Sequence, residues 1–557
     1  MAFDHNKYAP YHPIQLPDRT WPDKQLKAAP KWCSVDLRDG NQALIEPMTV
    51  EQKHKLFSKL LEVGFKEIEI GFPAASQPDF DFCRELIEGN RIPEDVTVQV
   101  LTQARPELIA RSFEALRGAK RAIMHVYNST STVQREQVFQ LDKAGIKEIA
   151  IKGANWVADH AEAQAETDWV FQYSPESFTG TEPDYAVDVC NAVIDVWKDR
   201  TKNPIIINLP ATVEMNTPNV YADQIEWMCR NLNHRERIEV SLHTHNDRGC
   251  GVAAAELGVL AGADRVEGTL LGNGERTGNM DVVTMAMNLY SRGIDPKLNF
   301  EDMDGVVATV QECTNLPVHP RHPWAGDLVF TAFSGSHQDA IRKSMQQYKE
   351  GQVWEVAYLP IDPKDIGRDY QAVIRVNSQS GKGGVAWMLE QNYGVSLPRW
   401  MQIELSREVQ QAAENSASEL SADEIWQLFE SRFLKCDEPW KLEGFELKSD
   451  GEEDVLHAHL RKGAQVCSTT GRGSGAMEAF IQGLYKKLGI QLEILDYTEH
   501  ATEQGSESQA IAFVHVNCDG QREVAAAMHR DIVSASLNAI LHGLNRHLQN
   551  NPDSEAA

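Results

Sequence analysis

Residues 238–247 read Ile-Glu-Val-Ser-Leu-His-Thr-His-Asn-Asp, a strand-like run that ends in polar residues. Successive side chains of a strand point to opposite faces, so His243 and His245 are expected on the same side. Two neutral imidazoles at one strand end supply half of the ligands of a divalent-metal site. Isolated histidine pairs on strands are more often surface or core residues, so the metal interpretation depends on the rest of the chain.

Strand-like runs alternate with amphipathic helical segments from residue 32 to about residue 292. About eight such alternations over roughly 250 residues predict an α/β fold, a (β/α)8 barrel. The rival fold, an open doubly wound sheet, is less favoured because no G-x-G-x-x-G motif follows the first strand. The predicted strands are 32–37, 67–70, 97–101, 122–127, 169–173, 205–209, 238–242 and 265–270.

Polar residues follow the ends of these strands. In a parallel barrel the carboxyl ends of all strands share one rim, and active sites form there. Residues far apart in the sequence are therefore predicted to converge on one pocket. The candidates are Arg38, Asp39, His125, Ser174, Glu176, Thr212, His243, His245, Glu275 and Asn279.

Asp39 offers a carboxylate and Asn279 an amide oxygen at the same rim as the two histidines. One Asp, two His and one amide, with positions left open, suit magnesium or manganese, with zinc as an alternative. The planar guanidinium of Arg38 suits an oxyanion that develops on a carbonyl substrate. The alternative role for Arg38 is only to balance the charge of Asp39.

Composition limits the classes of function. The chain has 557 residues, of which 42% are hydrophobic and 24% charged, so we expect a globular protein of two or three domains. The net charge of −27 argues against nucleic acid or an anionic membrane as partner. Nine scattered cysteines without C-x-x-C spacing fit free thiols. With no signal peptide and no apolar run of about 20 residues, we expect a cytoplasmic protein.

Beyond the barrel, a mainly helical linker region includes a predicted helix over 422–433. Two successive β-β-β-α patterns then predict a pseudo-symmetric α+β domain, with helices over 476–488 and 532–548. We divide the chain into an N-terminal extension (1–31), the catalytic barrel (32–326), linker subdomains (327–436) and a C-terminal domain (437–557).

The chain resembles the α-isopropylmalate and homocitrate synthase family. Residues 37–42 (LRDGNQ), followed by Lys53, resemble its first signature, and residues 243–249 (HTHNDRG) resemble its second. Residues 274–279 (GERTGN) and 334–340 (SGSHQDA) look like two further blocks. The resemblance extends from Trp32 through the C-terminal domain and is strongest to the longer members, which carry a leucine-sensing domain.

The resemblance implies a Claisen condensation of acetyl-CoA with 2-oxoisovalerate and water. The products are 2-isopropylmalate and CoA, at the first committed step of leucine synthesis. A metal on Asp39, His243, His245 and Asn279 would chelate the oxo acid, and Arg38 would stabilise the alkoxide.

The resemblance also assigns roles to other candidates. Ser174 and Thr212 would hydrogen-bond the oxo acid, and His125 would line its pocket. Glu176 would take part in proton transfer, with a helix-dipole role as the alternative. Glu275 would lie near the reacting water.

Two candidates lie outside the barrel. An imidazole such as His337 can relay protons near neutral pH. The resemblance implies that His337 and Tyr358 reach the active site of the partner subunit in a domain-swapped homodimer, and that leucine binds the C-terminal domain as a feedback inhibitor. Loop packing and simple dimerisation are the alternatives.

Three other functions stay open. The first is a sister synthase, such as homocitrate or citramalate synthase, because substrate choice depends on few pocket residues. The second is a lyase such as hydroxymethylglutaryl-CoA lyase, whose cysteine-rich loop has no counterpart here. The third is a leucine-responsive binding module on an inactive barrel, which the joint presence of Asp39, His243 and His245 disfavours.

Overall fold

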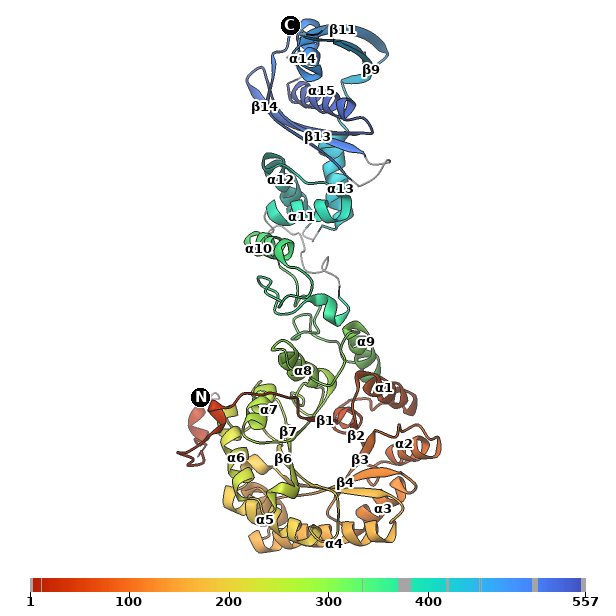
Figure 1. Cartoon of the computed structure of the whole chain (residues 1–557). Helices are drawn as coiled ribbons and strands as arrows, with labels where there is room; N and C mark the ends of the chain where they lie inside the picture. Colours follow the sequence, from red (N-terminus) through yellow and green to blue (C-terminus); the bar gives the residue numbers. More distant parts are fainter. Residues whose placement is uncertain are drawn as a thin grey trace. The chain divides into compact units, whose positions relative to one another are not determined.

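The computed structural model describes residues 4–551 except 12, 333, 369–381, 417–419, 450, 452 and 503–508. The chain forms two compact units, Met1–Val329 with Lys364–Arg368, and Phe330–Pro363 with Asp369–Ala557 (Figure 1). The division into four parts that we predict stays a prediction, and its outermost residues lie outside the described ones. Within the described residues, no helix is long and apolar enough to cross a membrane.

Eight parallel strands form a closed barrel in the first unit, neighbouring one another in chain order. The barrel closes where β1 pairs with β8, with Ser34 opposite Gly268. The predicted (β/α)8 barrel is therefore confirmed. Its strands are β1 (Lys31–Ser34), β2 (Glu67–Gly71), β3 (Thr97–Gln103), β4 (Arg121–Ser129), β5 (Asp168–Glu176), β6 (Ile205–Ala211), β7 (Ile238–Thr244) and β8 (Arg265–Gly268).

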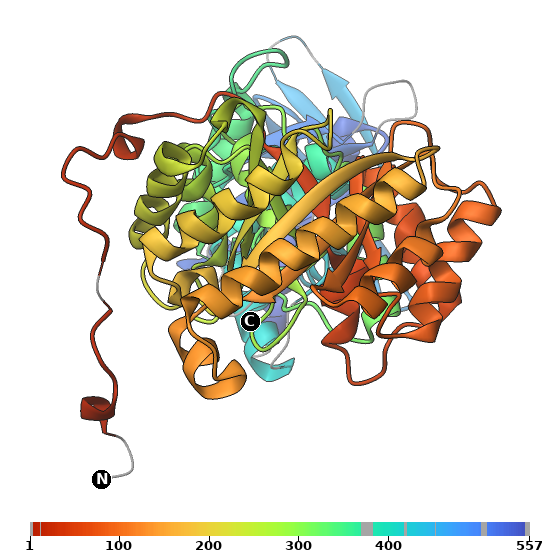
Figure 2. The ribbon, with the colours of Figure 1, turned by 90° about the horizontal axis from the view of Figure 1, so that it is seen from below.

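Helices surround these strands (Figures 1 and 2). The first helix begins at a capping box in which Thr49 and Gln52 bond each other's backbone N–H groups. It buries one apolar face, including Leu56, Phe57 and Leu60, against the barrel. The helices are α1 (Val50–Val63), α2 (Gln77–Glu88), α3 (Pro106–Leu116), α4 (Lys143–Ala163), α5 (Pro183–Trp197), α6 (Pro218–Asn231), α7 (Gly251–Leu260), α8 (Val282–Tyr290) and α9 (Met303–Thr314).

The first strand is shorter than predicted. It ends at Ser34, and Asp36–Gly40 form a π-helical turn in place of the last strand residues. The carboxylate of Asp36 accepts hydrogen bonds from the Ser34 hydroxyl (2.7 Å) and from the backbone N–H of Leu270 (3.0 Å). These bonds draw the chain back toward β8, so Arg38 and Asp39 project from a turn at the barrel rim.

The second unit contains two antiparallel three-stranded sheets, ordered β11-β10-β9 and β12-β13-β14. One helix follows each sheet, so the two predicted β-β-β-α units are confirmed. The predicted helix over 422–433 ends earlier, at Phe429, and a π-helical turn (Glu430–Leu434) follows it. The linker helices are α10 (Gly335–Gln347), α11 (Lys382–Tyr393), α12 (Arg399–Ser416) and α13 (Ala422–Phe429). The C-terminal elements are β9 (Trp440–Ser449), β10 (Asp454–Lys462), β11 (Gln465–Gly473), α14 (Ala476–Leu488), β12 (Leu492–Ala501), β13 (Ala510–Cys518), β14 (Gln521–His529) and α15 (Ile532–Asn550).

Candidate active site

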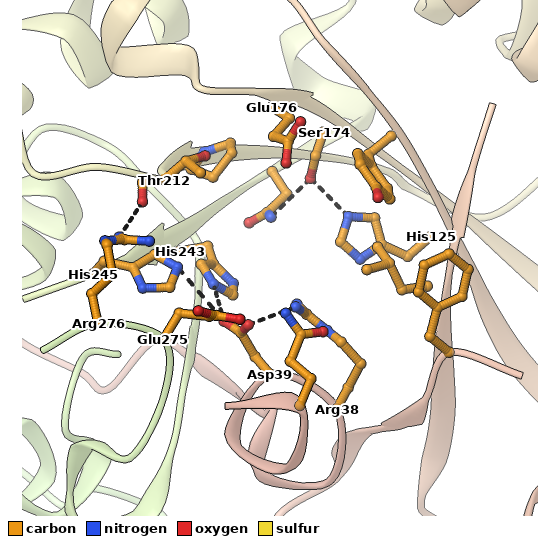
Figure 3. A pocket seen from close by; sticks show the side chains of 16 residues that line it. Arg38, Asp39, His125, Ser174, Glu176, Thr212, His243, His245, Glu275 and Arg276 are labelled. Carbon is orange, nitrogen blue, oxygen red and sulfur yellow. Dashed lines mark hydrogen bonds and ion pairs between the residues drawn. The ribbon is translucent and has the colours of Figure 1, made fainter. Parts of the chain in front are cut away.

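A cavity of about 290 Å³ lies at the carboxyl ends of the barrel strands (Figure 3). Nine of the predicted site residues line it, so the residues expected at the barrel rim do lie together. Its lining residues are Arg38, Asp39, Gln42, Phe72, Leu101, His125, Tyr127, Ser174, Glu176, Asn208, Pro210, Thr212, His243, His245, Glu275 and Arg276.

Three buried side chains of the cavity form a candidate metal centre. Asp39, His243 and His245 each offer one ligand atom, and these atoms lie within 4.8 Å of one another. The Nε2 atoms of His243 and His245 are 3.0 and 3.6 Å from the same oxygen, Oδ2 of Asp39. The amide nitrogen of Asn279 donates to that oxygen as well (2.7 Å). Asn279 thus joins the cluster without lining the cavity.

Two polar atoms at this cluster lack a partner. Nδ1 of His245 and Oδ1 of Asn279 are buried and have no hydrogen-bond partner among the described residues. Buried polar atoms are normally satisfied by protein, water or an ion. Together with a carboxylate and a second imidazole, they form a donor set that fits a divalent cation.

The loop after β8 leaves room for Asn279 because of two of its three glycines, Gly274 and Gly278. A Cβ atom at Gly274 would lie 2.2 Å from Oδ1 of Asn279. Gly278 has a φ of +102°, a conformation that favours glycine. The GERTGN block thus sets the position of a predicted metal ligand.

Arg38 and Asp39 form an ion pair in the buried turn. Nη1 of Arg38 lies 2.9 Å from Oδ1 of Asp39, and its Nε donates to Glu69 on β2. Burial raises the pKa of Asp39, but Arg38 and His243 more than offset this effect and hold the pKa well below its usual range. Asp39 is therefore ionised at neutral pH, as a metal ligand must be.

The two histidines differ in their proton affinity. Burial disfavours the charged form of His243, but hydrogen bonds to Asp39 and Glu267 raise its pKa to about 9. Burial and the neighbouring His243 lower the pKa of His245 to about 4. At neutral pH the pair therefore carries one positive charge, on His243.

The opposite wall carries the predicted substrate-binding residues. Nε2 of His125 lies 2.7 Å from the Ser174 hydroxyl, which also accepts a hydrogen bond from the Asn208 amide (3.0 Å). The Thr212 hydroxyl oxygen accepts from the backbone N–H of Ser177 (2.9 Å), so its own proton is available to a ligand. This wall can donate hydrogen bonds to the carboxylate of a bound ligand.

Two predicted acids have different surroundings in the cavity. Glu176 ends β5 and accepts a hydrogen bond from the Ser129 hydroxyl. It is the last residue of a strand, and the short 3-10 helix that follows (Phe178–Gly180) begins after Ser177, so Glu176 lies outside the first turn of that helix. Glu275 lines the cavity beside Arg276, which pairs with Asp247 (2.6 Å).

His337 and Tyr358 lie in the second unit and contact each other. Their rings stack with centroids 4.0 Å apart and an interplanar angle of 23°. Tyr358 is 60% exposed and has a positive φ of 64°. His337 lies on α10 and not in the loop that the sequence suggests, and Tyr358 lies in a separate turn. The sequence did not predict this pairing, because the two residues stand in separate segments.

Several site residues were missed by the sequence analysis. Asn208 lines the cavity, and Gln99, Arg265 and Glu267 form a polar layer beneath it; all four are buried. A signal for them exists, because polar residues recur at two-residue steps on successive strands, as in Gln172 and Ser174 on β5. Apolar runs alone do not mark these positions.

The barrel and its site place the first unit in a broad class of enzymes. Residues 29–310 match the HMGL-like family model, so the first unit is an HMGL-like barrel with a candidate metal centre at its rim. Residues 327–390 match the α-isopropylmalate synthase post-catalytic domain-like model. Residues 419–548 match the LeuA allosteric (dimerisation) domain.

Full-length relatives give the particular family. The 2-isopropylmalate synthase of Pseudomonas savastanoi pv. phaseolicola is 54% identical over 543 residues, which cover 97% of this chain and 97% of the relative. The enzyme of the same name from Rhodospirillum rubrum is 54% identical over 546 residues, covering 97% and 98% of the two chains. The chain belongs to the 2-isopropylmalate synthase family. The resemblance that the sequence motifs indicate is therefore confirmed, and the lyase and inactive-barrel alternatives are not supported.

Proposed function

We propose that the chain joins acetyl-CoA to 2-oxoisovalerate. The acetyl methyl group loses a proton and forms a bond to the keto carbon, and water then cleaves the thioester. The products are 2-isopropylmalate, CoA and a proton. The observation that carries this proposal is the convergence of Asp39, His243 and His245 in the barrel cavity of a member of this synthase family.

Asp39, His243, His245 and Asn279 would hold the divalent metal, for which magnesium is our first choice and manganese or zinc the alternatives. When bound, such an ion supplies Lewis acidity toward the keto oxygen and a template for the oxo acid. Arg38 is fixed by Asp39 and Glu69 and faces the cavity, so its guanidinium would stabilise negative charge on the former keto oxygen.

The cavity wall supports a small branched oxo acid as substrate. Thr212 and Ser174 would hydrogen-bond its carboxylate, with His125 holding Ser174 in place. Leu101 and Pro210 add apolar surface to the same cavity, which suits an isopropyl group. Pyruvate and 2-oxoglutarate, the substrates of sister synthases, lack this branched group.

Proton transfer would involve groups from both units. Glu176 and Glu275 line the cavity and would take part in moving the methyl proton and in activating water. His337 and Tyr358 would complete the site of the partner subunit in a homodimer, as the family resemblance implies. The LeuA allosteric (dimerisation) domain supports both the dimer and inhibition by leucine.

The proposed location is the cytoplasm. All nine cysteines lie in the described part of the chain and are free thiols, which supports a reducing compartment.

Free CoA release tests the proposed substrate. The purified chain is given acetyl-CoA and one of 2-oxoisovalerate, pyruvate or 2-oxoglutarate, with magnesium or with chelator. We expect thiol release with 2-oxoisovalerate and metal, suppressed by leucine. Faster release with pyruvate or 2-oxoglutarate would assign the chain to a sister activity, and no release with any acid would refute the condensation.

A further inference from the structure

Glu267 on β8 accepts hydrogen bonds from several buried side chains beneath the cavity. It is buried, at 1% exposure, and does not line the cavity itself. Its two carboxylate oxygens accept hydrogen bonds from five side chains. Oε1 accepts from Gln99 (3.1 Å), Gln172 (2.8 Å) and Arg265 (2.7 Å), and Oε2 accepts from His243 (2.7 Å) and Asn208 (3.3 Å).

Arg265 holds this carboxylate from below. Its guanidinium is completely buried and donates to Glu267, to the Ser241 hydroxyl (2.8 Å), to the Gln99 amide oxygen (2.9 Å) and to Glu67 (2.5 Å). A planar guanidinium with partners on all three nitrogens has little freedom to turn. Oε2 of Glu267 is consequently fixed toward His243.

This contact decides which nitrogen of His243 faces the candidate metal centre. A carboxylate can only accept, so Nδ1 of His243 donates a proton to Glu267. Nε2 faces Asp39, 3.0 Å away, and in the protonated imidazole it donates to that carboxylate. The Nε2 proton is the one that a metal ion at Asp39 would replace. Metal-binding histidines commonly have such an outer carboxylate, which fixes the ring and its tautomer.

The charged groups around His243 balance one another. Two guanidinium groups and the protonated imidazole of His243 face three carboxylates in this buried layer. The groups are Arg38, Arg265, Asp39, Glu69 and Glu267.

We propose that Glu267 is a positioning residue for the metal site, holding Nε2 of His243 toward the ion, and that Arg265 holds Glu267 in turn. This inference rests on the metal site of the proposed function. A purely structural role would stabilise the barrel without changing metal affinity, so the test measures both properties.

Glu267→Gln tests the inference because glutamine keeps the shape but brings an NH2 group. That group would face either the Nδ1–H of His243 or the donors of Arg265, and neither arrangement satisfies all partners. The affinity for Mn²⁺ is measured by electron paramagnetic resonance on the full chain, and the melting temperature by calorimetry. We expect about 10- to 100-fold weaker binding.

Glu226→Gln is the matched control, since Glu226 is also a buried carboxylate but lies on α6, where it pairs with Arg230 and accepts a hydrogen bond from Thr20. We expect it to change Mn²⁺ affinity by less than about twofold. Wild-type affinity in Glu267→Gln would overturn the inference while leaving the metal site intact. Absence of Mn²⁺ binding to the wild-type chain would overturn both.

A crystal structure of the wild-type chain with Mn²⁺ decides the matter if Glu267→Gln does not fold. We expect the ion on Nε2 of His243, with Nδ1 hydrogen-bonded to Glu267. An ion on Nδ1 would overturn the inference.

Discussion

Asp39 is the residue on which the cavity chemistry depends most, because Arg38, His243 and Asn279 all bond its carboxylate. Asp39→Asn removes the anionic ligand and leaves the side-chain volume almost unchanged. We expect metal affinity and CoA release to fall by about 100-fold or more. Isothermal titration with Mn²⁺ and the thiol assay measure the two effects.

The control for that variant is Asp95→Asn, which removes a solvent-exposed carboxylate that pairs with Lys66. It should bind metal and release CoA at the wild-type level. Equal losses in both variants would show that the effect of Asp39→Asn is not specific to the site.

Asp36 provides a prediction about pH. Burial raises its pKa from 3.8 to about 7, against the opposing effect of its hydrogen bond from Ser34. The folded state therefore binds this proton more tightly than the unfolded state does, so stability is lost as pH rises from about 4 to 7, by at most about 1.4 kcal/mol per pH unit. Asp36→Asn has no proton to lose, so its stability relative to wild type should rise between about pH 4 and pH 7 and change little above that range.

Calorimetric melting of both proteins at several pH values measures this difference. Ser34→Ala is a useful comparison, since it removes a bond to Asp36 and keeps the buried carboxyl. A pH-independent difference between Asp36→Asn and wild type would contradict the assignment.

The position of a single residue can be predicted well when a local pattern fixes the face to which its side chain points. The two-residue step in His-Thr-His puts both imidazoles on one side, and the rim rule adds Asp39 from a distant strand. Glu267 and Asn208 are not predicted in this way, because their role in the site depends on hydrogen-bond partners on other strands. Those contacts appear only when the barrel closes.

At the scale of elements, the loop between β8 and α8 controls the reach of Asn279. Gly274→Ala would place a Cβ 2.2 Å from Oδ1 of Asn279 and so displace this side chain. We expect metal affinity to fall about 10-fold with an unchanged melting temperature, because the glycine lies in a rim loop. Gly444→Ala, where the added Cβ meets nothing within 4 Å, is the control.

A Gly274→Ala chain with wild-type Mn²⁺ affinity would show that Asn279 is not a ligand. It would leave the centre to Asp39 and the two histidines.

Local periodicity predicts which helices and strands exist, and the structure confirms the barrel and both β-β-β-α units. It predicts less accurately the residues at which these helices and strands end. β1 ends early because Asp36 bonds Leu270, far along the chain, and no local pattern contains that contact. The turn that results, and not the strand, positions Arg38 and Asp39.

In the assembled homodimer, we propose that His337 acts in the partner subunit. Homodimers of Asp39→Asn and of His337→Ala should each be nearly inactive. When the two are mixed and allowed to exchange subunits, each mixed dimer has one site with Asp39 from one chain and His337 from the other. We expect recovery of about a quarter of wild-type activity.

Light scattering on the mixture should give twice the 62.4 kDa mass of one chain. No recovery in a mixture whose subunits have exchanged would place His337 in the site of its own chain. A monomeric mass would remove the basis for a shared site.

The most direct test of the central claim is the fate of the acetyl methyl carbon. The chain is incubated with metal, 2-oxoisovalerate and acetyl-CoA labelled with ¹³C in the methyl group, and the products are read by NMR. We predict that the label enters the methylene group of 2-isopropylmalate, with one CoA released per product. Label found only in acetate, or remaining in acetyl-CoA, would contradict it.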